Sequence, residues 1–360
     1  MAELLQYKCP CCGGALEFSP DLQKIQCPYC DTEFSPETFA ELDAALAAEK
    51  ADNLQWDTTS HSEWTAGETD GMVVYVCTSC GGEIIADENM GASSCPFCGN
   101  PVIVMGKFAG ELRPDCVIPF KLDKAAAKEG LRRHLSGKKL LPKVFRDEHH
   151  LDEIKGIYVP FWLFDADATA DIRYKGSRVR RWSDSRWHYT ETSYYSLFRA
   201  GSLSFAQIPA DGSSKLADEL MESIEPYDYS EAVDFRTAYL AGYLADKYDL
   251  NAEQNLDRVS ARAKNSVERT FSSTVNGYLS VIAEQSHVQL LNSRAKYALL
   301  PVWLLTTSWQ GENYIFAMNG QTGKFVGNLP MDKRAFWRYF LGTAGITAAA
   351  AAVMQWLAWL

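Results

Sequence analysis

The first hundred residues contain no arginine and only three lysines, against 17 aspartates and glutamates. This stretch carries a formal charge of −14, while the whole chain carries −11. Contacts to the phosphates of nucleic acids depend on lysine and arginine. The composition therefore argues against nucleic-acid binding by the first hundred residues.

Histidine is also scarce: the 360 residues include six, scattered along the chain. No spacing groups them with a nucleophile or with carboxylates as a hydrolytic or redox site would require. No secretory signal opens the chain, which favours a reducing environment for its ten cysteines. We therefore expect a protein that is not an enzyme and whose cysteines bind metal.

Eight of the ten cysteines form two copies of one pattern. In each copy a Cys-x-x-Cys pair is followed, after 14 residues, by a second such pair. Each pair aims two thiolates at one ion, and two pairs complete the tetrahedral shell of a structural zinc site. The sequence predicts two zinc ions, held by Cys9, Cys12, Cys27 and Cys30 and by Cys77, Cys80, Cys95 and Cys98.

Two other interpretations of the cysteines stay open. Disulfides would use the same residues in an oxidising compartment. Iron is the second alternative, because rubredoxin-like sites use similar Cys-x-x-Cys turns. Cys11 is expected to be a spare beside the ligand Cys12, although the two could exchange roles. Cys116 stands alone and is expected to be a small buried apolar residue.

The predicted fold class is α+β, in consecutive segments. Along the chain, two zinc ribbons come before a mixed body of helices and antiparallel sheet, and a transmembrane helix follows it. The expected segments are ribbon 1 at 1–34, a helix and linker at 35–71, ribbon 2 at 72–101, subdomains at 102–212 and 213–335, and a membrane helix at 336–360.

The body contains helical patterns and one repeated strand. Asp123 is expected to cap a helix that ends at Gly137, and further helices are expected near 214–224, 230–248 and 252–275. Two aromatic-aliphatic strands, at 158–163 and 299–305, each carry Pro two residues before Trp. This similarity predicts an internal duplication of the body.

A basic and aromatic stretch follows the first of these strands. Its arginines alternate with aromatic residues, a composition that can bind nucleic acid or lipid headgroups. A solvated hairpin is the simpler interpretation and the one we favour from sequence, and the stretch could also receive the acidic ribbons. The residues are Arg178, Arg180, Arg181 and Arg186 with Trp182, Trp187 and Tyr189.

The C-terminal residues 339–360 carry no charge over 22 residues. A helix of that length is about 33 Å long, which matches a hydrocarbon core of ~30 Å. Basic residues at 333, 334 and 338 precede it, so the rest of the chain is expected to be cytoplasmic. Ala344, Ala348 and Ala352 form a small-residue face that could join two chains. The alternative is a buried, alanine-rich core helix.

Several motifs together resemble the YdjG-type zinc-ribbon membrane proteins of bacteria, which are also labelled TFIIB-type zinc-ribbon proteins. Besides the two ribbons, the motifs are VIPFK at 117–121, GIYVPFWLF at 156–164, YLAGY at 239–243 and NGQTGK at 319–324. The resemblance covers nearly the whole chain. It implies an accessory membrane protein that works with SPFH-domain (flotillin-like) or phage-shock-type partners, and it supplies no catalytic residue.

These observations favour a single-pass membrane adaptor whose ribbons recruit a protein partner from the cytoplasm. Rigid acidic ribbons suit docking onto a basic or apolar surface. The alternative is a nucleic-acid-binding zinc-ribbon regulator, as in transcription factors. A closed shell of four cysteines offers no open coordination position for catalysis.

Overall fold

The computed structural model describes residues 9, 14, 16–37, 52–59, 62–88, 94–107, 112–146 and 151–359. The chain forms two compact units, each built from three separate stretches. Unit 1 contains Met1–Asp57, Phe164–Ile208 and Leu256–Ala295, and unit 2 contains Thr58–Leu163, Pro209–Asn255 and Lys296–Leu360. The consecutive domain boundaries expected from the sequence stay predictions.

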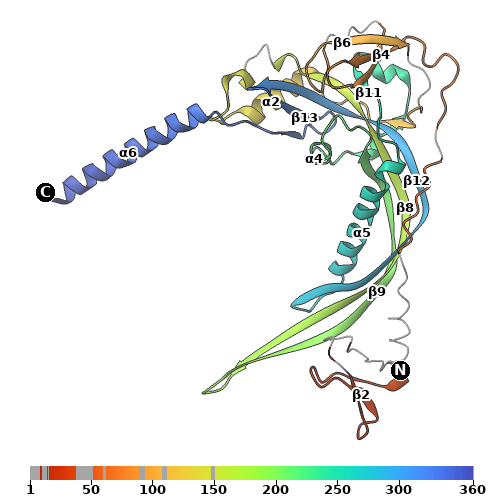
Figure 1. Cartoon of the computed structure of the whole chain (residues 1–360), viewed down its shortest axis with the longest axis vertical. Coiled ribbons are helices and arrows are strands. Elements are labelled where there is room, and N and C mark those ends of the chain that lie inside the picture. The colour runs from red at the N-terminus through yellow and green to blue at the C-terminus, as the bar shows by residue number, and fades with distance from the viewer. Residues whose placement is uncertain are drawn as a thin grey trace, which may run out of the picture. The chain divides into compact units, whose positions relative to one another are not determined.

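Strands outnumber helices in the described chain (Figure 1). The strands are β1 (Glu17–Ser19), β2 (Lys24–Gln26), β3 (Glu33–Phe34), β4 (Met72–Cys77), β5 (Glu83–Asp87), β6 (Val102–Lys107), β7 (Cys116–Val117), β8 (Lys155–Ser183), β9 (His188–Asp211), β10 (Val233–Asp234), β11 (Leu244–Asp246), β12 (Ser280–Trp309), β13 (Glu312–Asn319) and β14 (Phe325–Gly327). The helices are α2 (Lys124–Leu135), α4 (Asp218–Ser223), α5 (Leu256–Ser273) and α6 (Lys333–Trp359), with 3-10 turns at Lys143–Arg146, Tyr229–Glu231, Thr237–Leu240 and Glu253–Asn255. The body thus mixes sheet and helix, as expected, but is rich in sheet.

The strands build two sheets. In unit 1, β1, β2 and β3 form a small antiparallel sheet that is ribbon 1. The second sheet has 11 strands, ordered β10-β7-β12-β8-β11-β5-β4-β6, with β13 paired to β12, β14 paired to β13 and β9 paired to β8. The strands of ribbon 2, β4 to β6, are therefore one edge of the large sheet, joined to it where β5 pairs antiparallel with β11. The two ribbons share a cysteine pattern but differ in their surroundings.

Helix α2 forms as the sequence predicts. The Asp123 carboxylate accepts a hydrogen bond from the Ala126 backbone N–H at 2.8 Å, which caps the first turn. Ala127, Leu131 and Leu135, spaced four apart, are the buried positions. They pack in a core cluster with residues of β12 and β13. Helix α5 likewise falls within the predicted segment 252–275.

The helix expected at 230–248 is wrong. This stretch instead contains β10, β11 and two 3-10 turns. Strand β10 pairs with β7, while β11 is held between β8 and β5. Gly242 has φ +83°, a conformation that interrupts a helix. Pairing with strands that are distant in sequence therefore overrides the local helical pattern.

The two Pro-x-Trp strands make matching backbone contacts within unit 2. The carbonyl of Pro160 in β8 accepts from Gly212 N–H at 2.9 Å, and that of Pro301 in β12 accepts from Gly320 N–H at 2.8 Å. A short strand runs parallel beside each of them, β11 beside β8 and β7 beside β12. These matched contacts agree with an internal duplication of the body.

The two tryptophans also match. The indole N–H of Trp162 donates to the Leu250 carbonyl at 2.8 Å, and that of Trp303 donates to the Leu122 carbonyl at 3.0 Å. Each acceptor follows its short parallel strand at the same distance along the chain. In this alignment of the two halves, Asp246 occupies the position of Ile118, a residue of the main core.

Asp246 is an ionisable residue at the position where the other half of the body has the apolar Ile118, and it is only 1% exposed. Burial raises the pKa of Asp246 well above its usual value, the Ser213 hydroxyl opposes this, and the charges of Asp211 and Asp249 raise it further. The folded chain therefore keeps this proton to a higher pH than the unfolded chain does. Stability contributed by the protonated carboxyl is complete below the usual pKa of 3.8 and is lost as the pH rises through the raised pKa.

We expect Asp246→Asn to stabilise the protein above neutral pH by about 1–3 kcal/mol, because asparagine keeps the neutral shape without a charge to bury. Thermal unfolding in detergent should give a higher midpoint for the variant at pH 8 and equal midpoints near pH 4. Asp21→Asn, at an exposed position, is the control and should change neither value. Parallel pH curves for Asp246→Asn and the parent protein would contradict the assignment.

Candidate metal centres

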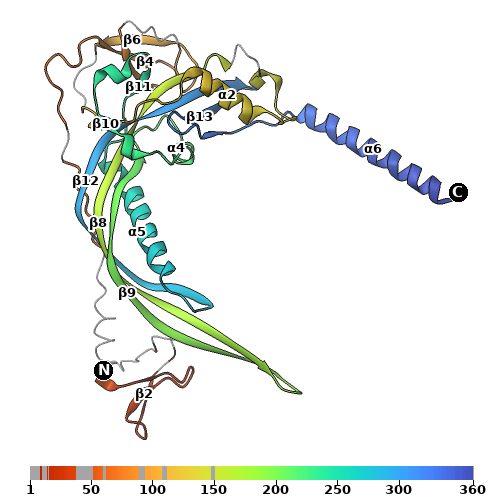
Figure 2. The same cartoon turned by 180° about the vertical axis from the view of Figure 1, so that it is seen from behind.

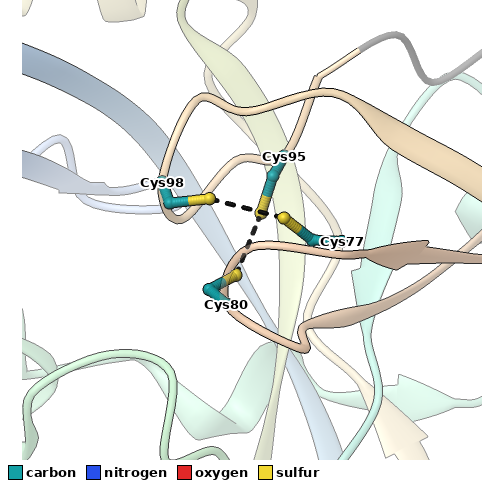
Figure 3. A group of neighbouring side chains, drawn as sticks. All are labelled: Cys77, Cys80, Cys95 and Cys98. Carbon is teal, nitrogen blue, oxygen red and sulfur yellow. Dashed lines mark hydrogen bonds between the residues drawn. The ribbon is translucent and has the colours of Figure 1, made fainter.

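Four cysteines of ribbon 2 converge in the structure, as Figure 3 shows. Cys77 ends β4 and Cys80 lies in the turn that follows, while Cys95 and Cys98 lie in the turn before β6. The sulfurs of Cys77 and Cys98 are 3.4 Å apart and those of Cys80 and Cys95 are 3.6 Å apart. All four lie within 4.8 Å of one another. Sulfurs held about 2.3 Å from a central ion in a tetrahedron would be ~3.8 Å apart, so the set could hold one metal ion.

The backbone of each turn explains why the thiols point the same way. Cys77 N–H donates to the Gly82 carbonyl at 2.9 Å, and Gly81 N–H donates back to the Cys77 carbonyl at 2.8 Å. Gly81 has φ +69°, which glycine adopts without strain. The second turn repeats both bonds with Cys95, Gly99 and Asn100.

The electrostatics of this cluster favour a cation. Burial raises the pKa of the Cys77 thiol, but hydrogen bonds from the backbone of Cys80 and Ser79 outweigh it and lower the pKa to about 7. Burial raises the pKa of Cys95, despite backbone hydrogen bonds, and the nearby Cys80 raises it further. Four thiolates this close repel one another, so full ionisation requires a bound positive ion. Thiolate sulfur suits zinc or iron far better than calcium or magnesium.

Two residues of the body support ribbon 2, and no sequence pattern predicted either of them. Thr306 of β12 donates its hydroxyl to the Pro96 carbonyl at 2.7 Å, inside the second cysteine turn. Lys155 of β8 donates its ammonium to the carbonyl and hydroxyl of Ser94, beside Cys95. Burial lowers the pKa of Lys155, and the negative charge at Cys95 acts in the opposite direction. Lys155 and Ser94 are 61 positions apart in the sequence, and Thr306 and Pro96 are 210 positions apart. A local sequence motif cannot predict contacts over such separations.

In ribbon 1 the described candidate ligands are Cys9, Cys27 and Cys30, whose sulfurs also lie within 4.8 Å of one another. The sulfurs of Cys9 and Cys30 are 3.6 Å apart. Cys12, the fourth predicted ligand, and its neighbour Cys11 lie outside the described residues. Asp31 takes the place of the turn glycine with φ +53° and donates its N–H to the Cys27 carbonyl at 2.9 Å.

No disulfide joins any two of the eight described cysteines. Cys116 does not join either cluster. It is partly buried against the main core, at the start of the short strand β7.

The roles of Cys11 and Cys12 can be separated directly. Cys11→Ser should leave the metal content unchanged, whereas Cys12→Ser should remove about one ion per chain, because Cys12 has the x-x spacing from Cys9 that the other three turns use. Elemental analysis of the purified variants measures this. The reverse result would exchange the two roles.

The only candidate membrane span among the described residues is Lys333–Leu357 in α6. Its mean hydropathy is 1.4, and none of its apolar window is buried by the rest of the described chain. The helix is long and apolar enough to cross a membrane. A core helix would have its apolar side covered by the protein.

One relative is similar to the chain over nearly its whole length. It is the uncharacterized protein YdjG of Bacillus subtilis (strain 168), which is 33% identical over 344 residues, or 96% of this chain and 95% of the relative. No known protein-family profile matches the chain. No solved structure matches it either.

Proposed function

The chain belongs to the family of Bacillus subtilis YdjG, and we propose that it is a single-pass, zinc-binding membrane adaptor that recruits a protein partner to the cell membrane. The partner we propose is an SPFH-domain (flotillin-like) or phage-shock-type protein. The bulk of the chain lies in the cytoplasm, and no step of catalysis is assigned to it. Both metal sites hold structural Zn²⁺, since a closed set of four thiolates has no open position for a substrate.

The observation that carries this proposal is a difference between equivalent residues of the two ribbons. Phe97 lies between the last two cysteines of ribbon 2 and is 4% exposed, packed in the main core. Tyr29 has the same place in ribbon 1 and is 74% exposed. Each ring packs against a glycine of its own ribbon, Gly82 or Gly14. Ribbon 2 therefore uses this position to join its own body, which leaves ribbon 1 available for another protein.

Ribbon 1 has further features that suit docking. Phe18 is 52% exposed and Leu22 is 49% exposed. Phe18 lies in β1 and Leu22 in the turn between β1 and β2 of the small three-stranded sheet of ribbon 1. Isolated exposed apolar residues are ordinary, but a tyrosine and two large apolar residues on a metal-stapled ribbon resemble the anchors of protein interfaces. Acidic side chains around them would favour a basic rim on the partner.

The membrane part of the proposal is supported by α6. Its exposed Trp356 and Trp359 lie at one end and Trp337 at the other, as the aromatic residues of a membrane interface do. The basic residues Lys333, Arg334 and Arg338 support a cytoplasmic location of the preceding chain, by the positive-inside rule. Two such helices could associate through the small-residue face at 344, 348 and 352.

The test is Tyr29→Ala in the tagged full chain, purified from cross-linked, detergent-solubilised native membranes. Mass spectrometry should find an SPFH-domain or phage-shock-type protein with the parent chain and several-fold less of it with the variant. The zinc content should stay at about two per chain, because Tyr29 supplies no ligand. Lys24→Ala on the same ribbon is the control and should retain the partner, because it removes an exposed basic side chain that a basic rim would not attract. Equal capture by Tyr29→Ala would remove ribbon 1 as the docking surface.

The alternative, a nucleic-acid-binding regulator, predicts a different result. We expect the full chain at micromolar concentration to give no salt-sensitive mobility shift of duplex DNA or RNA, because the ribbon residues lack the basic groups that neutralise phosphates. A shift that weakens with salt and is lost on substitution of ribbon cysteines would favour the alternative.

A further inference from the structure

The outer half of the hairpin formed by β8 and β9 has no core of its own. Residues 180–192, which include the turn, are all exposed. Within unit 1, both views show the hairpin continuing beyond the ends of β12 and α5 (Figures 1 and 2). An exposed two-stranded hairpin is only marginally stable in water unless another surface covers it.

The side chains on this segment are large and aromatic. Trp187 is 66% exposed, Phe198 60% and Trp182 45%. The rings of Trp182 and Tyr189 stack across the two strands, with centroids 5.4 Å apart and planes 12° apart. Exposed tryptophan and tyrosine combine an apolar ring with a polar N–H or O–H, which suits the headgroup region of a bilayer.

The same segment is basic in an otherwise acidic chain. Residues 178–199 contain five arginines and two carboxylates. One of these carboxylates, Asp184, is used within the turn, where it accepts hydrogen bonds from Arg186 N–H, Trp187 N–H and the Tyr189 hydroxyl. Arg180 lies 5.5 Å from the centroid of the Trp182 ring. Basic and aromatic groups are therefore interleaved within one exposed segment.

We propose that residues 178–199 of the hairpin dock on the anionic phospholipids of the membrane in which α6 is anchored. Arg180, Arg181 and Arg186 contact lipid phosphates, and the tryptophan and tyrosine rings enter the headgroup region, whereas Arg178 bonds the Gly277 carbonyl within the fold. Each basic residue near such a surface contributes about 1 kcal/mol, and the attraction weakens with salt. This proposal rests on the membrane anchoring proposed above, which confines the hairpin near a bilayer and raises its effective concentration there.

Anionic lipid is favoured over nucleic acid as the occupant. A chain with a formal charge of −11 repels a polyanion at long range, and its acidic N-terminal hundred residues add to that repulsion. A lipid surface held close by a membrane helix does not have to diffuse toward the protein. Exposed rings without a sequence-reading pocket also suit a headgroup layer, which offers no fixed base edges to recognise.

Hydrogen exchange of the full chain in lipid nanodiscs tests the proposal. One set of discs contains phosphatidylcholine alone and the other contains about one third phosphatidylglycerol. Backbone amides of residues 180–192 should exchange about tenfold more slowly in the anionic discs, and ~0.5 M salt should remove most of that difference. Equal exchange in both discs would overturn the proposal. Protection of the same amides in lipid-free detergent would also overturn it, because another part of the chain would then cover the hairpin.

A matched pair of variants assigns the effect to the hairpin. Arg180→Gln with Arg186→Gln should abolish the protection in anionic discs, whereas Arg236→Gln with Arg269→Gln, an equal charge change at exposed sites elsewhere, should preserve it. Equal protection in both double variants would overturn the assignment. Flotation separates failure of this proposal from failure of the anchor. If α6 does not insert, the parent chain should still float with anionic liposomes at low salt and the hairpin variant should not.

Discussion

At high salt, which weakens binding of the hairpin to anionic lipid, deleting residues 336–360 should move the protein from the membrane fraction into the soluble fraction. The deleted segment contains the whole uncharged stretch at 339–360 and most of α6, and the described chain buries none of the helix's apolar window. Exposing so much apolar helix to water is unfavourable at about 25 cal/mol per Å², so this surface requires a membrane or a partner. Cell fractionation and immunoblotting measure the shift.

The remaining body should stay folded after this deletion. Ala335, the last residue kept, is 6% exposed, and Asp332 N–H donates to the Leu140 carbonyl at 2.9 Å. The buried Ala335 and the Asp332 hydrogen bond both lie before the deletion and are retained. We therefore expect the truncated protein to keep about two zinc ions and to unfold at the temperature of the parent body. A soluble but zinc-free product would show that the deletion had damaged the fold, and the fractionation would then need the point variants described next.

A charged substitution tests the same helix without shortening the chain. Ala349→Arg, near the middle of the uncharged stretch, should reduce insertion, since arginine at the centre of a membrane helix costs about 2.5–3.5 kcal/mol. Ala349→Leu is the matched control and should insert at least as well as the parent. If the truncated chain stays in the membrane but is removed by high salt, the hairpin is a second anchor. If it resists salt, another segment inserts.

The sequence predicted the local elements of this fold better than their assembly. The cysteine turns and α2 were predictable because each depends on residues within about five positions of one another, such as Asp123 and Ala126. The α6 span was predictable from composition alone. These features need no information about distant parts of the chain.

The surroundings of ribbon 2 were not predictable in this way. Its two supporting contacts, from Lys155 and Thr306, come from strands far away in the sequence. The segment at 35–71, expected to be a helix and linker, also makes long-range contacts. Within unit 1, Trp56 is 9% exposed, donates its indole N–H to the Ser260 hydroxyl at 3.0 Å and packs edge-on against Phe164. Such pairings are set by the fold as a whole.

The two ribbons look alike in sequence, so their different surroundings lead to unequal expected effects of metal loss. Cys77 and Cys95 are completely or almost completely buried in the main core, together with Phe97. Ribbon 1 has a separate small cluster formed by Cys9 and Cys27 with a few partly buried neighbours. Removing a structural metal unfolds the part of the protein that depends on it.

We therefore expect Cys95→Ser with Cys98→Ser to remove about one zinc and to lower the unfolding midpoint of the body by more than ~10 °C, or to prevent folding. Cys27→Ser with Cys30→Ser should also remove about one zinc but leave the midpoint of the body unchanged, while partner capture is lost. Elemental analysis, thermal unfolding in detergent and the capture experiment measure the three quantities. If elemental analysis finds iron in the parent protein, the metal is iron and not zinc, but the expected difference in stability between the two double variants is the same.

If the ribbon 2 double variant cannot be purified, a milder pair of variants makes the same comparison. Thr306→Val weakens ribbon 2 without changing a metal ligand, because it removes the hydroxyl that donates to the Pro96 carbonyl. It should lower the free energy of unfolding of the body by about 1–3 kcal/mol, and the unfolding midpoint with it, and leave both zinc ions bound. Thr32→Val, next to Cys30 in ribbon 1, removes a comparable hydroxyl 3.1 Å from the Cys30 sulfur and should leave the midpoint of the body unchanged. Equal destabilisation by the two valine variants would mean that ribbon 1 is also part of the folded body, and Tyr29 would then lose its role as an independent docking residue.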